Sequence, residues 1–466
     1  MKSQPTRNHR NFLTALCLVL LLTSPIQAKE ASPAPRLVIL GLDGVTFDVL
    51  NPLIEAGRLP NIAKLVQTGA SSVLLSEKPM RSPALWTTVA TGQPRDVHGI
   101  YDFVTGSRYW PKEARHRKQE LVTSDMLKSP PLWAMASAAG LPSLVVGWLN
   151  TWPAQPIKGV MVAPYVALGQ SKQTSIKGKI YKNEQGQTFP EATFNALKDQ
   201  VLSASDVPTS RIAQIADLPH QKSSLYRKIP KLKRYTYTIR WSIASTLTNT
   251  AIVETLLENQ PDTRLVMSYF DGSDTLAHRF WLMRQPLPEI KARLKGHKLP
   301  PSTAKELKRR FGGVIDGYYE LLDEMVGRIH AAAGPQSTLI LLSDHGWGKQ
   351  DRKRAIHSGV PFDGQHELEG VFIAHGPMIR AGKFKDLTLY DVAPTALYLM
   401  GQGVPEELPG KIALDMVQES FKLQNPPITL ANNALKTTPE KKEAKKTKAP
   451  HAETEIERLK SLGYIQ

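Results

Sequence analysis

Three apolar segments of this chain each lead into acidic residues. The segments are residues 37–42 before Asp43, residues 265–270 before Asp271 and Asp274, and residues 338–342 before Asp344 and His345. Continuous apolar runs of this length are typical of parallel strands buried on both faces, and open α/β sheets bind ligands at the carboxyl ends of their strands. We therefore expect these carboxylates and the imidazole to meet at one edge of a sheet. Such a group of side chains is typical of a metal site.

Asp274 and His278 form a second candidate ligand pair. They are four residues apart in a segment expected to be helical, so both side chains lie on one face and can chelate one ion. Taken alone, a pair with this spacing is more often an ordinary surface pair. His366 is a further candidate ligand, and His357 and His375, which flank it, are the alternatives.

Ser82 is the candidate nucleophile. It precedes Pro83, and Gly92 follows after a helix-forming segment, which predicts a helix with serine at the N-cap, proline at N1 and glycine at its end. A hydroxyl at a helix N-terminus lies at the positive end of the helix dipole, which attracts phosphate and favours an alkoxide. The alternative interpretation is an ordinary capping serine.

The composition is that of a globular protein with a large core. The chain has 466 residues, of which 41% are hydrophobic and 22% charged, and its net charge is +17. No nucleic-acid recognition motif is present, so we do not expect nucleic acid as a partner. The excess of positive charge instead favours anionic small-molecule substrates or peripheral contact with an anionic membrane surface. The sequence predicts no oligomeric state.

The first 28 residues resemble a secretory signal. Lys2, Arg7 and Arg10 precede an apolar segment at residues 12–23, and small residues precede an expected cleavage site before Lys29. We therefore expect a secreted or periplasmic protein, with an uncleaved anchor as the alternative.

The only cysteine, Cys17, lies inside this expected signal. A mature chain without cysteine has no disulfides or thiolate metal sites, so oxygen and imidazole nitrogen must supply any metal ligands.

The rest of the chain predicts one α/β domain over residues 29–423, with an insertion or cap at about residues 165–235. A basic, exposed excursion is expected at residues 282–310. A Lys-rich disordered tail with a short C-terminal helix is expected at residues 424–466. Further helices are expected at residues 47–57, 60–69, 235–259, 311–333 and 391–400, and further strands at residues 143–148, 160–166 and 370–374.

The order of these motifs resembles the alkaline phosphatase superfamily, and within it the type I phosphodiesterase/nucleotide pyrophosphatase branch. The motifs are Asp43-Gly44 after a strand, Ser82 at a helix start, Asp274-x-x-x-His278, Ser343-Asp344-His345-Gly346, and Gly364-x-His366. The resemblance covers roughly residues 36–415. It implies an α/β three-layer sandwich with a mostly parallel central sheet and an inserted cap.

The resemblance also implies a ligand set for two divalent metal ions, usually zinc, with manganese as the alternative. One ion would be held by Asp274, His278 and His366. The other would be held by Asp43, Asp344, His345 and the oxygen of Ser82. Ser82 occupies the position of the nucleophile, which is often threonine in this branch.

The expected function is that of an extracytoplasmic, metal-dependent phosphoester hydrolase that acts through a phospho-Ser82 intermediate. Diesters or nucleotide pyrophosphates are expected ahead of monoesters as small-molecule substrates. The alternatives are a phosphoryl-headgroup transferase, a phosphomonoesterase of the same superfamily, or a non-catalytic envelope binding protein. Ser82-Pro83-Ala84 does not fit the Cys/Ser-x-Pro-x-Arg sequence of sulfatases.

Overall fold

The computed structural model describes Met1 and residues 36–115, 118–164, 186–295, 300–348 and 364–431. Backbone contacts divide the chain into residues 1–34 and residues 35–466. The fold below is that of the second unit. The expected signal, the end of the Lys-rich tail and part of the expected cap lie outside the described residues.

The core of this unit is a large, mostly parallel sheet. Its strands follow the order β11-β2-β10-β7-β1-β6-β3-β4-β5, with β12 also paired to β2. The central strands are β1 (Leu37–Leu42), β6 (Leu265–Phe270), β7 (Thr338–Leu342), β3 (Ser143–Val146) and β4 (Gly159–Val162), all parallel. The outer strands are β2 (Ala70–Leu75), β5 (Thr188–Phe189), β10 (Glu369–His375), β11 (Gly382–Lys383) and β12 (Leu387–Thr388). β10 is antiparallel to both β7 and β2.

Alternate residues of β1 enter two different hydrophobic cores. Val38 and Leu40 pack on one side of the sheet, whereas Leu37 and Ile39 pack on the other, because successive strand side chains point to opposite faces. Both faces are therefore covered by helices. This explains why β1, β6 and β7 are apolar without alternation.

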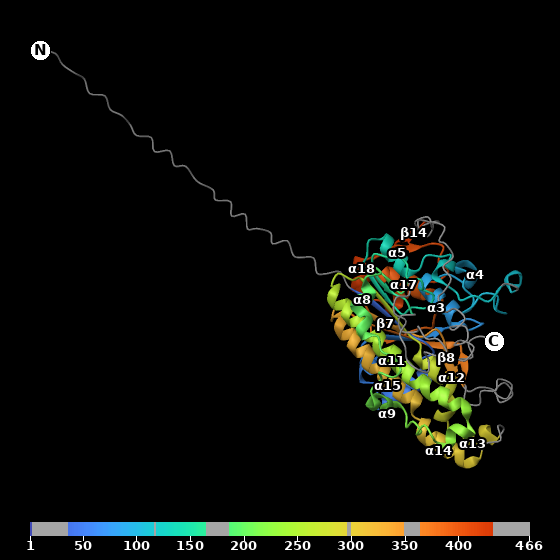
Figure 1. Cartoon of the computed structure of the whole chain (residues 1–466). Coiled ribbons are helices and arrows are strands. Elements are labelled where there is room, and N and C mark those ends of the chain that lie inside the picture. Colours follow the sequence, from blue (N-terminus) through green and yellow to red (C-terminus); the bar gives the residue numbers. More distant parts are fainter. Residues whose placement is uncertain (2–35, 116–117, 165–185, 296–299, 349–363, 432–466) are drawn as a thin grey trace. The chain divides into compact units, whose positions relative to one another are not determined.

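The helices form the two outer layers of a three-layer α/β sandwich (Figure 1). One layer contains α1 (Phe47–Glu55), α2 (Pro60–Thr68), α11 (Pro230–Asn259), α12 (Gly272–Arg284) and α15 (Val314–Ala333). The opposite layer contains α3 (Ser82–Thr91), α5 (Leu132–Ala138) and α17 (Val392–Leu399). This architecture confirms the predicted three-layer α/β sandwich with a mostly parallel central sheet.

Shorter elements complete the described chain. They are α4 (Arg95–His98), α8 (Thr193–Leu197), α9 (Thr209–Ile215), α10 (Ser224–Lys228), α13 (Leu287–Lys295), α14 (Pro301–Phe311), α18 (Glu419–Gln424), β8 (Gly346–Gly348), β9 (Gln365–Glu367), β13 (Val404–Pro405) and β14 (Thr429–Leu430). None of the described helices combines the length and the apolar character that a membrane span requires.

Asp323 of α15 links two helices of the first layer. α2 has Leu59 at its N-cap and no capping side chain of its own. Instead, the carboxylate of Asp323 accepts hydrogen bonds from the backbone N–H of Ile62 at 2.7 Å and of Asn61 at 3.2 Å, and from Asn61 Nδ2 at 2.9 Å. A carboxylate at this position also interacts favourably with the helix dipole.

Two sequence predictions about local structure are wrong. Residues 282–310 are not an exposed excursion, because α13 and α14 bury Ile290, Leu294 and Leu307 in the first core. In the sequence of these two helices, the many basic residues obscure the helical spacing of the apolar residues. Ser82 is the first residue of α3 rather than its N-cap, which is Arg81. Helix ends commonly shift by one residue between prediction and structure.

Candidate active site

Three acidic residues meet at the carboxyl ends of the central strands. β1, β6 and β7 end at the same level, since Leu42 is paired with Phe270 and Gly41 with Leu342. Asp43 follows β1, Asp344 follows β7, and Asp274 lies in the first turn of α12, after β6. All three carboxylates are buried.

Two aromatic side chains fix the orientation of Asp43. The Tyr269 hydroxyl donates a hydrogen bond to Asp43 Oδ2 at 2.5 Å, and Trp86 Nε1 donates to the same atom at 3.1 Å. Asp43 Oδ1 lies 3.4 Å from His345 Nε2 and has no hydrogen-bond partner among the described residues. One carboxylate oxygen is therefore held in place, and the other is left to bind a cation.

His345 is oriented in the same way. It is fully buried, and its Nδ1 lies 3.1 Å from the Gly346 carbonyl oxygen. Nδ1 therefore carries the proton and donates to this carbonyl, which leaves the Nε2 lone pair facing the carboxylates. Nε2 lies 3.7 Å from Asp274 Oδ1 and 3.8 Å from Asp344 Oδ2.

Asp274 belongs to two candidate metal-binding triplets. One triplet is Asp274, His278 and His366, and the other is Asp43, Asp274 and His345. His366 Nε2 lies 3.3 Å from Asp274 Oδ1 and 3.3 Å from His278 Nε2, and His278 Nε2 lies 3.6 Å from Asp274 Oδ2. Ligand atoms of a tetrahedral zinc ion, bound at about 2.0–2.1 Å, lie about 3.3 Å apart. The spacing of both triplets is therefore close to that of metal ligands.

Trp347 packs among the histidines. Its buried ring lies edge-on to His278, with centroids 4.7 Å apart, and to His366, at 4.9 Å. β8 places Trp347 opposite His366 of β9. The ring centroid of Trp281 lies 5.8 Å from that of Trp347. The contacts of Trp347 with both imidazoles therefore restrict their rotation.

Ser82 is the first residue of α3, the helix that carries Trp86. Ser82 is buried, and Trp86 follows one helical turn later on the same helix face. Because Trp86 Nε1 bonds to Asp43, this face of the first turn is directed at the carboxylates. The backbone N–H groups of a first helical turn have no intrahelical partners and favour an anion there.

Burial dominates the titration of these groups in the metal-free protein. It raises the pKa of Asp43 well above its usual value, and the charges of Asp344 and Asp274 raise it further. Burial also raises the pKa of Asp344 to about 8 and lowers the pKa of His366 to about 3. Burial alone would raise the pKa of Asp274 too, but His278, His366 and His345 reverse its effect and lower that pKa. A cation bound among these buried carboxyl groups would favour their ionised forms, so the cluster is suited to binding a cation.

Comparison with known proteins identifies the family. The family model for type I phosphodiesterase/nucleotide pyrophosphatase matches residues 37–413. The chain belongs to the type I phosphodiesterase/nucleotide pyrophosphatase family. This membership indicates phosphoester hydrolysis as the chemistry. A search of curated proteins found no match to the chain.

Solved structures agree with this family at the level of the fold. A mutant of the alkaline phosphatase PafA matches at 13% identity and a TM-score of 0.53, covering 83% of this chain and 100% of that one. The wild-type PafA structure matches at 11% identity and a TM-score of 0.51, with the same coverage. Both confirm that this phosphodiesterase-family chain has the alkaline-phosphatase-like fold.

Six of the predicted site residues lie together in the structure: Asp43, Asp274, His278, Asp344, His345 and His366. The seventh, Ser82, is buried in the first turn of α3, four residues before Trp86, which contacts Asp43. The tightest triplet around His345 includes Asp274, whereas Asp344 lies slightly farther away. His357 lies outside the described residues.

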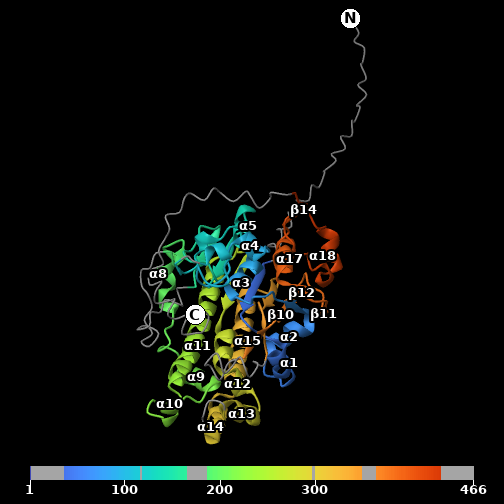
Figure 2. The same cartoon turned by 90° about the vertical axis from the view of Figure 1, so that its right-hand side faces the viewer.

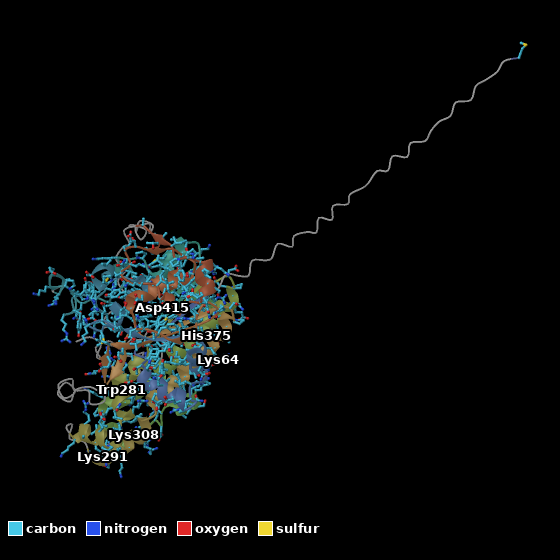
Figure 3. The ribbon with its side chains drawn as sticks, turned by 180° about the vertical axis from the view of Figure 1, so that it is seen from behind. Lys64, Trp281, Lys291, Lys308, His375 and Asp415 are labelled. Carbon is cyan, nitrogen blue, oxygen red and sulfur yellow. The ribbon has the colours of Figure 1, made fainter. Side chains whose placement is uncertain are left out.

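Several other histidines and charged residues are placed away from the triplets. His375 (Figure 3) is paired with Leu339 near the amino end of β7. Its ring centroid lies 5.4 Å from that of His330. His98 is buried in the helical layer, where Nε2 contacts the Thr88 hydroxyl at 3.2 Å and Nδ1 accepts from Ile100 N at 3.1 Å. The guanidinium of Arg81 is engaged by Asp102, at 2.6 and 2.8 Å.

Sequence reasoning missed the residues that orient the candidate ligands: Tyr269, Trp86 and Trp347. A signal existed for Trp86, because its spacing of four from Ser82 places both on one helix face. No local spacing connects Tyr269 with Asp43, since the contact depends on the pairing of β1 with β6.

Proposed function

We propose that this protein is a metal-dependent phosphoester hydrolase in which Ser82 is the nucleophile. The observation that supports this proposal best is the pair of triplets that share Asp274, placed beside the first turn of α3. Phosphodiesters or nucleotide pyrophosphates are the proposed small-molecule substrates ahead of monoesters.

We propose two divalent ions, zinc or alternatively manganese, as the cofactors. The donor set fits, because all candidate ligand atoms are carboxylate oxygens or imidazole nitrogens, and Asp43 Oδ1, Asp344 Oδ2 and His345 Nε2 are buried without a hydrogen-bond partner among the described residues. Buried polar atoms in this state are unfavourable unless a ligand satisfies them. Bound ions would stabilise negative charge on the attacking and leaving oxygens.

In the proposed reaction, Ser82 Oγ gives its proton to solvent and attacks phosphorus in line with the leaving oxygen. The bond from phosphorus to Ser82 Oγ forms as the bond to the leaving oxygen breaks, and the leaving oxygen takes a proton from solvent, giving phosphoserine and an alcohol or phosphate product. Water then gives up a proton to solvent and attacks phosphorus, the bond to Ser82 Oγ breaks, and Ser82 Oγ takes a proton from solvent as the second product leaves. The first turn of α3 contributes a positive dipole end and backbone N–H groups near the reacting phosphoryl group.

The proposed location is secreted or periplasmic. This proposal is supported by the signal-like residues 1–28 and by the absence of cysteine from the remaining sequence. N-terminal sequencing of the mature protein from an extracytoplasmic fraction tests it. An intact N-terminus in a cytoplasmic fraction would contradict it.

The test of function is hydrolysis of bis-p-nitrophenyl phosphate and p-nitrophenyl phosphate by the purified protein. We expect turnover that chelation abolishes, that zinc or manganese restores, and that Ser82→Ala removes. Ser137→Ala is the matched control, since Ser137 lies on α5, where its hydroxyl bonds to Trp133 O and Lys158 N. Phosphate trapped on Ser82 after acid quench would identify the intermediate directly.

Three results would reject the proposal. Turnover by Ser82→Ala equal to that of the parent protein would exclude Ser82 as nucleophile. Protein that binds two metal ions but hydrolyses neither substrate, nor a panel of nucleotide pyrophosphates, would favour the non-catalytic binding protein. Transfer of the phosphoryl group to an added alcohol in preference to water would favour the transferase.

A further inference from the structure

One end of the structure carries an excess of exposed positive charge. This basic end consists of α10, the first turns of α11, and helices α13 and α14. Its exposed cations include Lys228, Lys231, Lys291, Lys295, Lys305 and Arg309. Its acidic residues among the described positions of residues 217–240 and 287–311 are Asp217, Glu289 and Glu306. Positive charge therefore greatly exceeds negative charge in these helices.

The helices of the basic end form one continuous structure. Asp217, between α9 and α10, forms ion pairs with Arg309 at 2.6 Å and Arg310 at 2.9 Å of α14. In the interior of the basic end, the ring of Phe280 on α12 packs between two others. Its centroid lies 6.4 Å from that of Tyr235 on α11 and 5.4 Å from that of Phe311 on α14. Figure 2 shows α10, α13 and α14 gathered at the same end, and Figure 3 shows Lys291 and Lys308 there.

The exposed cations repeat at helical spacing. Lys291 and Lys295 are four residues apart on α13, and Lys305 and Arg309 are four residues apart on α14. Like charges at this spacing repel and destabilise a helix. Much of the remaining surface is different, because Arg211 pairs with Glu324 and Arg328 pairs with Glu254. The stability of the fold therefore does not explain the repeated lysines of α13, whereas Arg309 of α14 is also paired with Asp217.

A partner with many negative charges does explain them. Cations that repel one another at helical spacing, such as Lys291 and Lys295, would gain an attractive interaction with such a partner. Lysine predominates, and its compact, flexible ammonium suits mobile phosphate headgroups better than a fixed bidentate contact. Among the aromatic side chains at this end, Tyr235 and Phe311 are buried and Tyr226 is partly buried, so they offer little exposed surface for stacking nucleic-acid bases.

We propose that the basic end binds the headgroups of an anionic lipid bilayer. The proposal does not depend on the chemistry proposed for Ser82. It assigns a role to the positive charge of the basic end, which the motifs of the candidate active site do not explain.

The test is co-sedimentation of the full chain with vesicles of phosphatidylcholine alone or mixed with phosphatidylglycerol. We expect binding to the mixed vesicles at low salt, little binding to phosphatidylcholine, and loss of binding at high salt. The triple variant Lys291→Gln, Lys295→Gln and Lys305→Gln removes three exposed charges. Because each lysine near an anionic surface contributes about 1 kcal/mol, its partition coefficient should fall about 100-fold.

The matched control removes the same charge elsewhere. Lys64→Gln, Lys383→Gln and Lys385→Gln change exposed lysines on α2 and near β11, and this variant should keep most of its vesicle binding. Lysines of residues 424–452 are present in both variants, so the difference between the variants is the decisive measurement. Circular dichroism and thermal unfolding check that both variants fold.

Three outcomes would overturn the proposal. They are equal losses of binding in the two triple variants, no binding of the parent protein to mixed vesicles at low salt, and tighter binding of duplex DNA that the basic-end substitutions abolish. Hydrolysis of bis-p-nitrophenyl phosphate should be unchanged by either set of substitutions. Loss of vesicle binding with normal hydrolysis thus separates this proposal from the proposed function.

Discussion

Replacing Tyr269 with phenylalanine tests whether Asp43 is a metal ligand with a fixed orientation. The change removes one hydroxyl, and the ring remains packed between Trp86, with centroids 5.1 Å away, and Trp148, at 6.4 Å. Asp43 Oδ2 then loses its 2.5 Å hydrogen bond and keeps only the 3.1 Å bond from Trp86 Nε1. Burial raises the pKa of Tyr269, so the hydroxyl is protonated and is a donor at neutral pH.

The expected effect is a weaker metal site in a folded protein. A hydrogen bond to a charged group contributes about 1.5–3 kcal/mol, and loss of a residue that orients a ligand typically lowers metal affinity about 10–100-fold. Zinc affinity is measured by competition with a chromogenic chelator, and the rise in melting temperature on adding zinc gives an independent value. We expect kcat/KM at limiting zinc to fall in parallel and to recover at high zinc.

The control for Tyr269→Phe is Tyr319→Phe. Tyr319 is equally buried, but its hydroxyl accepts a hydrogen bond from the backbone N–H of Thr46 rather than donating to a carboxylate. If both variants bind zinc as tightly as the parent protein, Asp43 does not depend on Tyr269 for its position. If both lose affinity equally, the effect is one of general stability.

Three further predictions concern stability. Exhaustive chelation should lower the melting temperature, since ions at about 1,000 times their dissociation constant add about 4 kcal/mol; an unchanged value would argue against the metal site. Asp323→Ala should lower the free energy of unfolding, measured in urea, by about 3 kcal/mol, because the N–H groups of Asn61 and Ile62 lose their acceptor. Asp323→Asn should lower it by less. Equal stability of the parent protein and both variants would contradict the capping role. Burial lowers the pKa of His98 to about 3, so only the unfolded chain takes up this proton between pH 6.5 and about 3, and stability falls as the pH falls through that range. Between pH 6.5 and pH 5 the free energy of unfolding should fall by about 2 kcal/mol on account of His98. In His98→Gln it should depend less steeply on pH. Equal pH dependence of the parent protein and the variant would refute this prediction.

The sequence predicted the parts of the site that depend on local pattern. The strand ends before Asp43 and Asp344, and the helical spacing of Asp274 and His278, are set within a few residues of chain. The same holds for the central strands, whose apolar runs are long and continuous. Local pattern therefore predicted a parallel α/β sheet with acidic residues at one edge, whereas the three-layer fold class and the full ligand set came from the resemblance to the family.

The remaining features depend on contacts between distant segments. The orientation of Asp43 by Tyr269 requires the pairing of β1 and β6 in one register, which no single segment encodes. The position of Asp274 between two triplets likewise depends on where β9 places His366. At residues 282–310, the many charged side chains hid the amphipathic pattern of α13 and α14. Burial of Ile290 and Leu294 then decided the structure.

Helix α12 fixes a length scale for the molecule. It begins beside the candidate metal ligand Asp274 and ends just before α13, and its 13 residues extend about 20 Å. If α13 contacts a bilayer as proposed above, the distance from that bilayer to Asp274 is on the order of this helix length. A membrane-embedded substrate must project its phosphoester across that gap to reach Ser82, whereas a soluble ester can diffuse into it. The length of α12 would thus favour substrates whose phosphoester group extends far enough from the membrane surface to reach the site.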